Sequence, residues 1–192
     1  MSTRRHLGQI HLLDFSVAVS NNERAHGSDY RFTQLPARVA DGRGLVVVPV
    51  EFKHLHTGDY SIVGHEDRVC VERKTLEDLF GTLGNGRERF SREFERMDQM
   101  DFAAVVIEAN WYEIMRPADY RGDWRSKMNS RAVWATIFSW SQDFPHVHWF
   151  TMGSRRIAEM ATFEILEMYW RKHVCDLDSD LHRQEVLALG SS

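Results

Sequence analysis

The sequence predicts an α/β domain in which helices flank a mixed central sheet. Segments rich in β-branched residues alternate along the chain with segments whose apolar residues recur at helical spacing. The segment 102–107 is continuously apolar, which is typical of a strand buried on both faces of a sheet. The length of 192 residues, with 43% hydrophobic and 27% charged residues, suits one globular domain with its own core.

Five segments rich in β-branched or aromatic residues predict strands. In order along the chain they are residues 45–52, 60–63, 68–74, 102–108 and 147–152. Pro49 places the first of them at an edge or a bulge, because proline cannot donate a hydrogen bond to a neighbouring strand. A turn at residues 64–67 allows the second and third strands to pair as a hairpin. Residues 10–19 are a further candidate strand.

Four segments have apolar residues at the spacing of a helix face. They are residues 76–83, 87–100, 130–142 and 154–172. Gly84, Asn85 and Gly86 end the first of these helices, because such residues tolerate a positive φ. The last helix has apolar residues in several directions and must therefore be covered on several sides. We expect it to form a dimer interface.

The composition limits the compartment and the partners. Two cysteines and no signal-peptide pattern predict a reducing, cytoplasmic environment, and no apolar run approaches the roughly 18 residues of a membrane span. The net charge of −4 gives no bulk attraction to nucleic acid, so DNA binding would need a local basic patch. Residues 121–131 contain such a patch, for which the alternative is a solvated loop.

Three charged side chains are predicted to meet at the end of one strand. Glu72 and Lys74 are two residues apart in the strand 68–74, so their side chains emerge on the same face. Asp59 lies beside them if the strands pair as a hairpin. Carboxylates are hard ligands for Mg²⁺ or Mn²⁺, and a lysine can orient the attacking water or offset charge that develops on phosphate. The pattern favours phosphodiester hydrolysis; a surface salt bridge is the alternative.

These residues belong to a longer motif. Residues 58–78 have the pattern GDY-x(11)-ERK-x(3)-D, and the chain continues with Gly86-Arg87 and the strand 104–108. The motif resembles the signature of the XPF-type structure-specific endonucleases, which include archaeal Hef, and is most similar to their stand-alone bacterial and phage forms. The resemblance extends over residues 30–172 and implies the restriction-endonuclease-like fold of the PD-(D/E)xK superfamily, a mixed central sheet flanked by helices.

The resemblance also implies a role for each residue of the motif. Asp59 and Glu72 would be the ligands of Mg²⁺ or Mn²⁺, and Lys74 would be the catalytic lysine. Arg73 would be an essential arginine that holds a backbone phosphate, and Asp78 the acid that closes the motif. Further contacts to DNA phosphates are expected from Arg87, Arg125, Lys127 and Arg131.

One part of the family pattern is missing. The family usually carries an Asp-x-Arg-Glu segment on an early strand, and no such segment is present in this sequence. Glu23 and Glu51 are the candidate sources of the missing carboxylate. Glu93 has the i, i+4 spacing for a pair with Arg89, which we expect rather than contact with a metal. Glu108 ends a strand and is either an acid that supports the metal ligands or an ordinary strand-end carboxylate.

The expected organisation is a divergent N-terminal segment over residues 1–29, a nuclease domain over 30–173 and an acidic tail over 174–192. The expected function is a metal-dependent DNA endonuclease that selects branched, nicked or flapped DNA, in DNA repair, recombination or phage DNA processing. The alternative is a non-catalytic DNA-binding or scaffold subunit with a degenerate centre. We expect a homodimer, with a heteromeric partner as the alternative.

Overall fold

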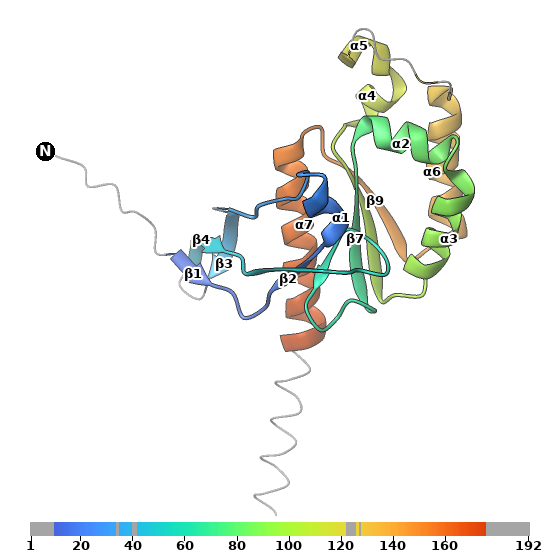
Figure 1. Ribbon diagram of the computed structural model, residues 1–192. Coiled ribbons are helices and arrows are strands. Elements are labelled where there is room, and N and C mark those ends of the chain that lie inside the picture. Colours follow the sequence, from blue (N-terminus) through green and yellow to red (C-terminus); the bar gives the residue numbers. More distant parts are fainter. Residues whose placement is uncertain (1–9, 34, 40–41, 122–125, 127, 176–192) are drawn as a thin grey trace, which may run out of the picture.

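The computed structural model describes residues 10–33, 35–39, 42–121, 126 and 128–175 (Figure 1). A six-stranded sheet forms the centre of this part of the chain. Its strands, in spatial order, are β5 (Val50–Lys53), β2 (Val17–Ser20), β6 (Tyr60–Ile62), β7 (Val69–Lys74), β8 (Phe102–Ile107) and β9 (Val147–Thr151). Only β6 runs against the other strands of this sheet, which confirms the predicted mixed sheet.

A second, three-stranded sheet lies beside the first. Its order is β1 (Ile10–Leu12), β4 (Gly42–Val47) and β3 (Leu35–Val39). The prediction of a single strand over residues 45–52 is therefore wrong. β4 ends before Pro49 and β5 begins after it, and the two strands belong to different sheets. Proline has no N–H to donate to a ladder, and here its carbonyl oxygen accepts a hydrogen bond of 2.8 Å from the backbone N–H of Val17.

The N-terminal region takes part in both sheets. The candidate strand over residues 10–19 is divided into β1 and β2, which belong to different sheets. β2 pairs with β5 in parallel and with β6 antiparallel. Part of the N-terminal segment predicted over residues 1–29 therefore belongs to the central sheet.

Helices cover both faces of the six-stranded sheet (Figure 1). α7 (Arg155–Trp170) packs on one face, and α2 (Leu76–Leu83), α3 (Arg87–Met97) and α6 (Ser130–Asp143) pack on the other. The shorter elements are α1 (Asn21–Ala25), α4 (Trp111–Met115), α5 (Pro117–Arg121) and a π-helical turn (Arg171–Cys175). Within the described residues, no helix is long and apolar enough to cross a membrane.

The strand β7 contributes side chains to two separate cores. Val71 lies in the core beneath α7, whereas Cys70 lies in the core that α2, α3 and α6 form with the sheet. Because side chains alternate along a strand, Glu72 continues the face of Cys70, and Arg73 continues the face of Val71. The end of β7 therefore presents different chemistry on its two sides.

Gly58 is required where the chain enters β6, and we expect its replacement to destabilise the fold. Its φ is +74°, and an added Cβ would lie 2.9 Å from the Cβ of Cys70. Gly58→Ala should lower the free energy of unfolding by about 2 kcal/mol or more, because left-handed strain adds to the steric overlap. Gly27→Ala is the matched control, since Gly27 has a φ of +64° but nothing within 4 Å of its added Cβ. Equal losses in urea unfolding would contradict this prediction.

Candidate active site

A hairpin brings Asp59 to the end of β7. β6 and β7 pair antiparallel, with Tyr60 opposite Val71, as the sequence predicts. The backbone N–H of Asp59 donates to the carbonyl oxygen of Val71 at 2.9 Å. The backbone N–H of Arg73 donates to Oδ2 of Asp59, also at 2.9 Å. The register of the hairpin thus fixes the Asp59 carboxylate next to the ERK residues.

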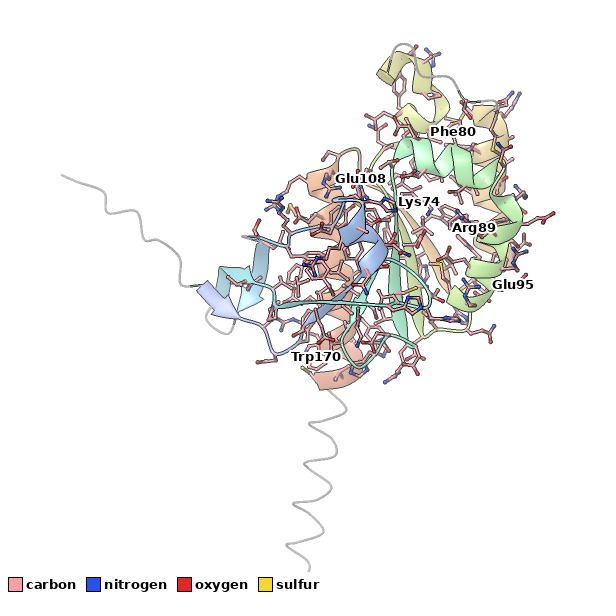
Figure 2. The ribbon with its side chains drawn as sticks, viewed as in Figure 1. Lys74, Phe80, Arg89, Glu95, Glu108 and Trp170 are labelled. Atoms are coloured by element: carbon pink, nitrogen blue, oxygen red, sulfur yellow. The ribbon has the colours of Figure 1, made fainter. Side chains whose placement is uncertain are left out.

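Glu72 and Lys74 lie together on the side of β7 that faces α3. Lys74 donates from Nζ to Oε1 of Glu72. Its Nζ also lies 4.8 Å from the centre of the Phe90 ring, which α3 supplies. The Lys74 side chain is 12% exposed and the Glu72 side chain is 7% exposed. Asp59, Glu72 and Lys74 therefore meet in a largely desolvated position at the carboxyl end of the strand, the end at which Figure 2 labels Lys74 and Glu108.

Burial shapes the ionisation of these three groups. Burial and the neighbouring charge of Glu72 raise the pKa of Asp59 well above its usual range. Burial also raises the pKa of Glu72, although the Lys74 ammonium opposes this. Burial lowers the pKa of Lys74, but the carboxylates of Glu72 and Asp59 outweigh it, and the net shift is upward. Two carboxylates with one ammonium leave an excess of negative charge that a bound cation would stabilise.

A third acid reaches this cluster from α3. Oε1 of Glu93 accepts a hydrogen bond of 3.4 Å from the backbone N–H of Gly58. The Glu93 charge acts on Glu72, whose pKa it helps burial to raise. The i, i+4 spacing with Arg89 gave no sign of this position, because it describes the surface of α3 and not the hairpin packed against it.

Arg73 points to the opposite face of β7. Its Nε donates to Oε1 of Glu108 at 2.7 Å, and its Nη1 donates to Oε2 of Glu23 at 3.0 Å. The guanidinium also lies over the Tyr30 ring, 5.4 Å from its centre. The side chain is 7% exposed. Two carboxylates of this chain thus hold the Arg73 guanidinium, and its contact with a DNA phosphate stays a prediction.

The Arg73 network extends to α7. Tyr30 donates from Oη to Glu108 at 3.0 Å, and burial together with that carboxylate raises the pKa of Tyr30, so the hydroxyl stays a donor. Arg155 of α7 lies 3.4 Å from the same Glu108 oxygen and donates to the carbonyl oxygens of Ser28 and Asp29 at 2.8 Å. These contacts connect the segment that follows α1 to α7 and to the face of β7 that carries Arg73.

The two candidate accessory acids lie in different places. Glu23 follows the end of β2 at Ser20, and the spacing of these two residues equals that of Asp and Glu in an Asp-x-Arg-Glu segment. Ser20 caps α1, and its backbone N–H donates to the carbonyl oxygen of Asp59 at 2.8 Å. Glu51 lies on β5, is 54% exposed and pairs with Lys53 at 3.6 Å. The structure therefore brings Glu23, and not Glu51, to the Arg73 network.

The remaining predicted site residues lie outside the Asp59 cluster. Asp78 is exposed and accepts a hydrogen bond of 2.7 Å from Thr75, the residue that caps α2. Arg87 donates to Oγ1 of Thr136 at 2.8 Å and so ties α3 to α6. Arg131 is exposed at the start of α6. Arg125 and Lys127 lie outside the described residues.

The donor set suits a hard divalent cation held by few protein ligands. No group of three or more His, Cys, Asp or Glu side chains is arranged to hold a metal ion among the described residues. Glu72 nevertheless offers a buried carboxylate and Asp59 a half-buried one, and a single lysine lies beside these two charges. Mg²⁺ characteristically takes one or two carboxylates and keeps waters or substrate phosphate oxygens in its other positions. These residues therefore fit such an ion.

The fold and the site define the class of protein, which is an α/β domain with two carboxylates and a lysine at the end of a central strand. The family model of the ERCC4 domain matches residues 28–160, which is more than half of the chain. The chain belongs to the ERCC4 domain family, a family of DNA endonucleases. The structure of XPF from Aeropyrum pernix is similar, with a TM-score of 0.52 and 18% identity over 84% of this chain and 69% of that chain. No curated protein matches the sequence.

Arg73 should be far more important for stability than an exposed arginine. Arg73→Met leaves Glu23 and Glu108 without their buried cation, and we expect a loss of about 3–5 kcal/mol in the free energy of unfolding. Arg68→Met is the control, because Arg68 is 39% exposed where it pairs with Asp101, and such pairs contribute about 1 kcal/mol or less. Urea unfolding measures both, and similar losses would contradict a special role for Arg73.

Proposed function

We propose that this chain is a metal-dependent DNA endonuclease that hydrolyses phosphodiester bonds and selects branched, nicked or flapped DNA. The convergence of Asp59, Glu72 and Lys74 at the end of β7 supports this proposal most directly. Membership of the ERCC4 domain family supports action on DNA. DNA repair, recombination or phage DNA processing is the setting that we propose for such an activity.

In the proposed mechanism, Asp59 and Glu72 would hold Mg²⁺ or Mn²⁺. Such an ion polarises a phosphate and lowers the pKa of a coordinated water. Lys74 keeps its ammonium charge because the two carboxylates stabilise it, and that charge can offset the negative charge that develops on phosphate in the transition state. Arg73 acts as a positioning residue, since its backbone N–H holds Asp59 while Glu23 and Glu108 hold its guanidinium.

A non-catalytic DNA-binding or scaffold subunit is the second candidate function. The observation that favours it is Ser20, which stands at the end of β2 where the spacing to Glu23 would place the aspartate of an Asp-x-Arg-Glu segment. A carboxylate is absent at that position of this sequence. The cluster of three acids, Asp59, Glu72 and Glu93, argues against the scaffold function, because it supplies negative charge for a cation.

We further propose that two copies pair through α7. Ile157 on this helix is 47% exposed. Further along α7, Met160, Ile165 and Met168 are partly buried and line two hollows beside this helix. A heteromeric partner on the same face is the alternative.

We also propose a reducing, cytoplasmic location for this chain. The unpaired Cys70 and Cys175 support that proposal.

Cleavage of a labelled flapped duplex tests the catalytic assignment. We expect Glu72→Gln and Lys74→Met each to lower the rate by about 10²-fold or more, because each removes charge that acts in the transition state. Glu51→Gln should cleave at the wild-type rate, and EDTA should stop all cleavage. Equal DNA binding without cleavage in either Mg²⁺ or Mn²⁺ would instead establish the scaffold function.

Thermal melting tests the cation site without reference to cleavage. The pKa of Asp59 is higher in the folded chain than in the unfolded chain, so protonated Asp59 favours folding below the pKa of the unfolded chain. This contribution is lost as the pH rises through the pKa of the folded chain, and ionised Asp59 therefore lowers stability at pH 7. Asp59→Asn should therefore melt about 2–4 °C above the wild type in EDTA. Mn²⁺ should raise the melting temperature of the wild type only. A similar rise in the variant would exclude Asp59 as a ligand.

A further inference from the structure

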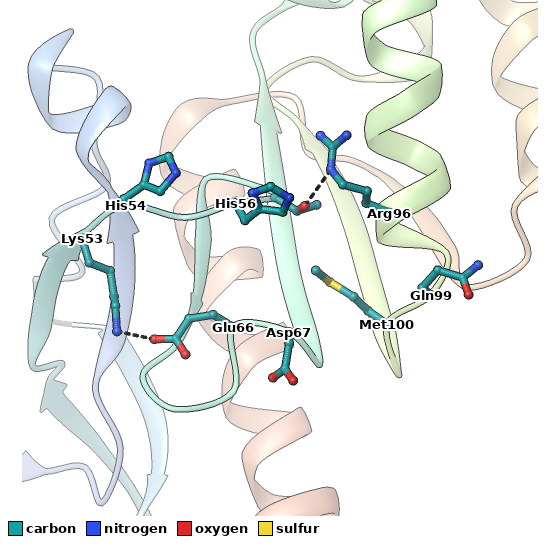
Figure 3. A pocket seen from close by; sticks show the side chains of 9 residues that line it. Lys53, His54, His56, Glu66, Asp67, Arg96, Gln99 and Met100 are labelled. Carbon is teal, nitrogen blue, oxygen red and sulfur yellow. Dashed lines mark hydrogen bonds and ion pairs between the residues drawn. The ribbon is translucent and has the colours of Figure 1, made fainter.

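The described part of the chain contains a pocket with a volume of about 520 Å³, which Figure 3 shows from close by. We call it the His56 pocket. Its walls come from β5 and the segment that follows it, from the turn between β6 and β7, and from the end of α3. The lining residues are Lys53, His54, His56, Thr57, Glu66, Asp67, Arg96, Gln99 and Met100.

The pocket is joined to the site through the backbone. Thr57 lines the pocket and is separated from Asp59 only by Gly58. Arg96 donates from Nε to Oγ1 of Thr57 at 3.1 Å. His56 is three residues before Asp59, so their Cα atoms are at most about 11 Å apart. That length corresponds to about three steps of a stacked DNA strand, so a strand with a phosphate at the site can reach the pocket.

The chemistry of the lining suits a nucleobase. Two imidazole rings and the guanidinium of Arg96 are flat groups on which a base can stack, and Met100 supplies a buried apolar surface. Gln99 and Asp67 offer hydrogen-bond donors and acceptors for the edge of a base. The charge of Lys53 is balanced by Glu66, which accepts a hydrogen bond from it at 2.5 Å (Figure 3). Arg96 then remains as the principal cation of the lining.

We propose that the His56 pocket holds an unpaired nucleotide within about three nucleotides of the scissile phosphate. This inference rests on the proposed endonuclease function and specifies its substrate. A base that is already unpaired can enter a protein pocket at a smaller cost than a base that must leave a duplex. The pocket therefore favours DNA with a flap, gap or branch over a continuous duplex. Cations that contact only phosphates would not make this distinction.

Binding to the cleavage-deficient Glu72→Gln chain tests the proposal. Fluorescence anisotropy would compare a flapped duplex with a blunt duplex of the same length. We expect His56→Ala with Arg96→Ala to raise the Kd for the flapped DNA about tenfold and to change the Kd for the blunt duplex less than twofold. Arg92→Ala, one turn earlier on α3 and outside the lining, is the control and should affect both DNAs equally. Equal weakening with the pocket variant, or no weakening, would overturn the proposal.

Abasic substitution identifies the nucleotide that occupies the pocket. Removing the base at each unpaired position in turn should weaken binding about tenfold at one position when the pocket is intact. The same abasic DNA should cause no further loss with the His56→Ala, Arg96→Ala chain, because the interaction is already gone. Additive losses would show that the base and the pocket do not meet, which overturns the proposal.

The outcomes separate this proposal from the proposed function. The binding measurements use a chain that does not cleave, whereas cleavage is measured with the wild type. Wild-type cleavage without discrimination by the pocket would retain the nuclease and refute the pocket. Both substituted side chains are exposed, so the variants should fold, and thermal melting verifies this. If the double variant melts early, His56→Ala alone should still raise the Kd for flapped DNA about threefold, and an unchanged Kd would overturn the proposal.

Discussion

The hydrogen bond from the backbone N–H of Arg73 to the Asp59 carboxylate is the constraint on which the site depends. It exists because Tyr60 lies opposite Val71 in the antiparallel pair of β6 and β7. A slip of one residue in that register would turn every side chain of β6 to the other face. Gly58, with its positive φ and close approach to β7, fixes the point at which the chain enters the pair.

The two faces of β7 divide the work of the site. Glu72 and Lys74 present charge on the α3 side. On the other side, the Arg73 guanidinium donates hydrogen bonds to Glu23 and Glu108. Breaking that second cluster would leave buried charges unpaired, which costs several kcal/mol. On the α7 side of the strand end, the charges of Arg73, Glu23 and Glu108 therefore pair with one another, whereas on the α3 side two carboxylates lie beside one ammonium.

Much of this arrangement is predictable from local pattern. The spacing of Glu72 and Lys74 and the turn before β7 predict the hairpin that brings in Asp59. Two features required information that no local pattern contains. The division of residues 45–52 between two sheets depends on what each half pairs with, although Pro49 marks the break. The approach of Glu93 depends on how α3 packs against the hairpin, and periodicity describes only the surface of a helix.

The departure from the family pattern becomes interpretable once the partners of each acid are known. Glu23 has the spacing from Ser20 that the glutamate of the missing segment would have. Its carboxylate accepts a hydrogen bond from Arg73, so it lies on the face of β7 opposite Glu72. Ser20 uses its hydroxyl to cap α1 and leaves no charge beside Asp59. The negative charge available to a cation on the front of β7 then comes from Asp59 and Glu72, with Glu93 contributed by α3. No carboxylate stands at Ser20, but Glu93 of α3 adds a third acid to Asp59 and Glu72 at the same strand end.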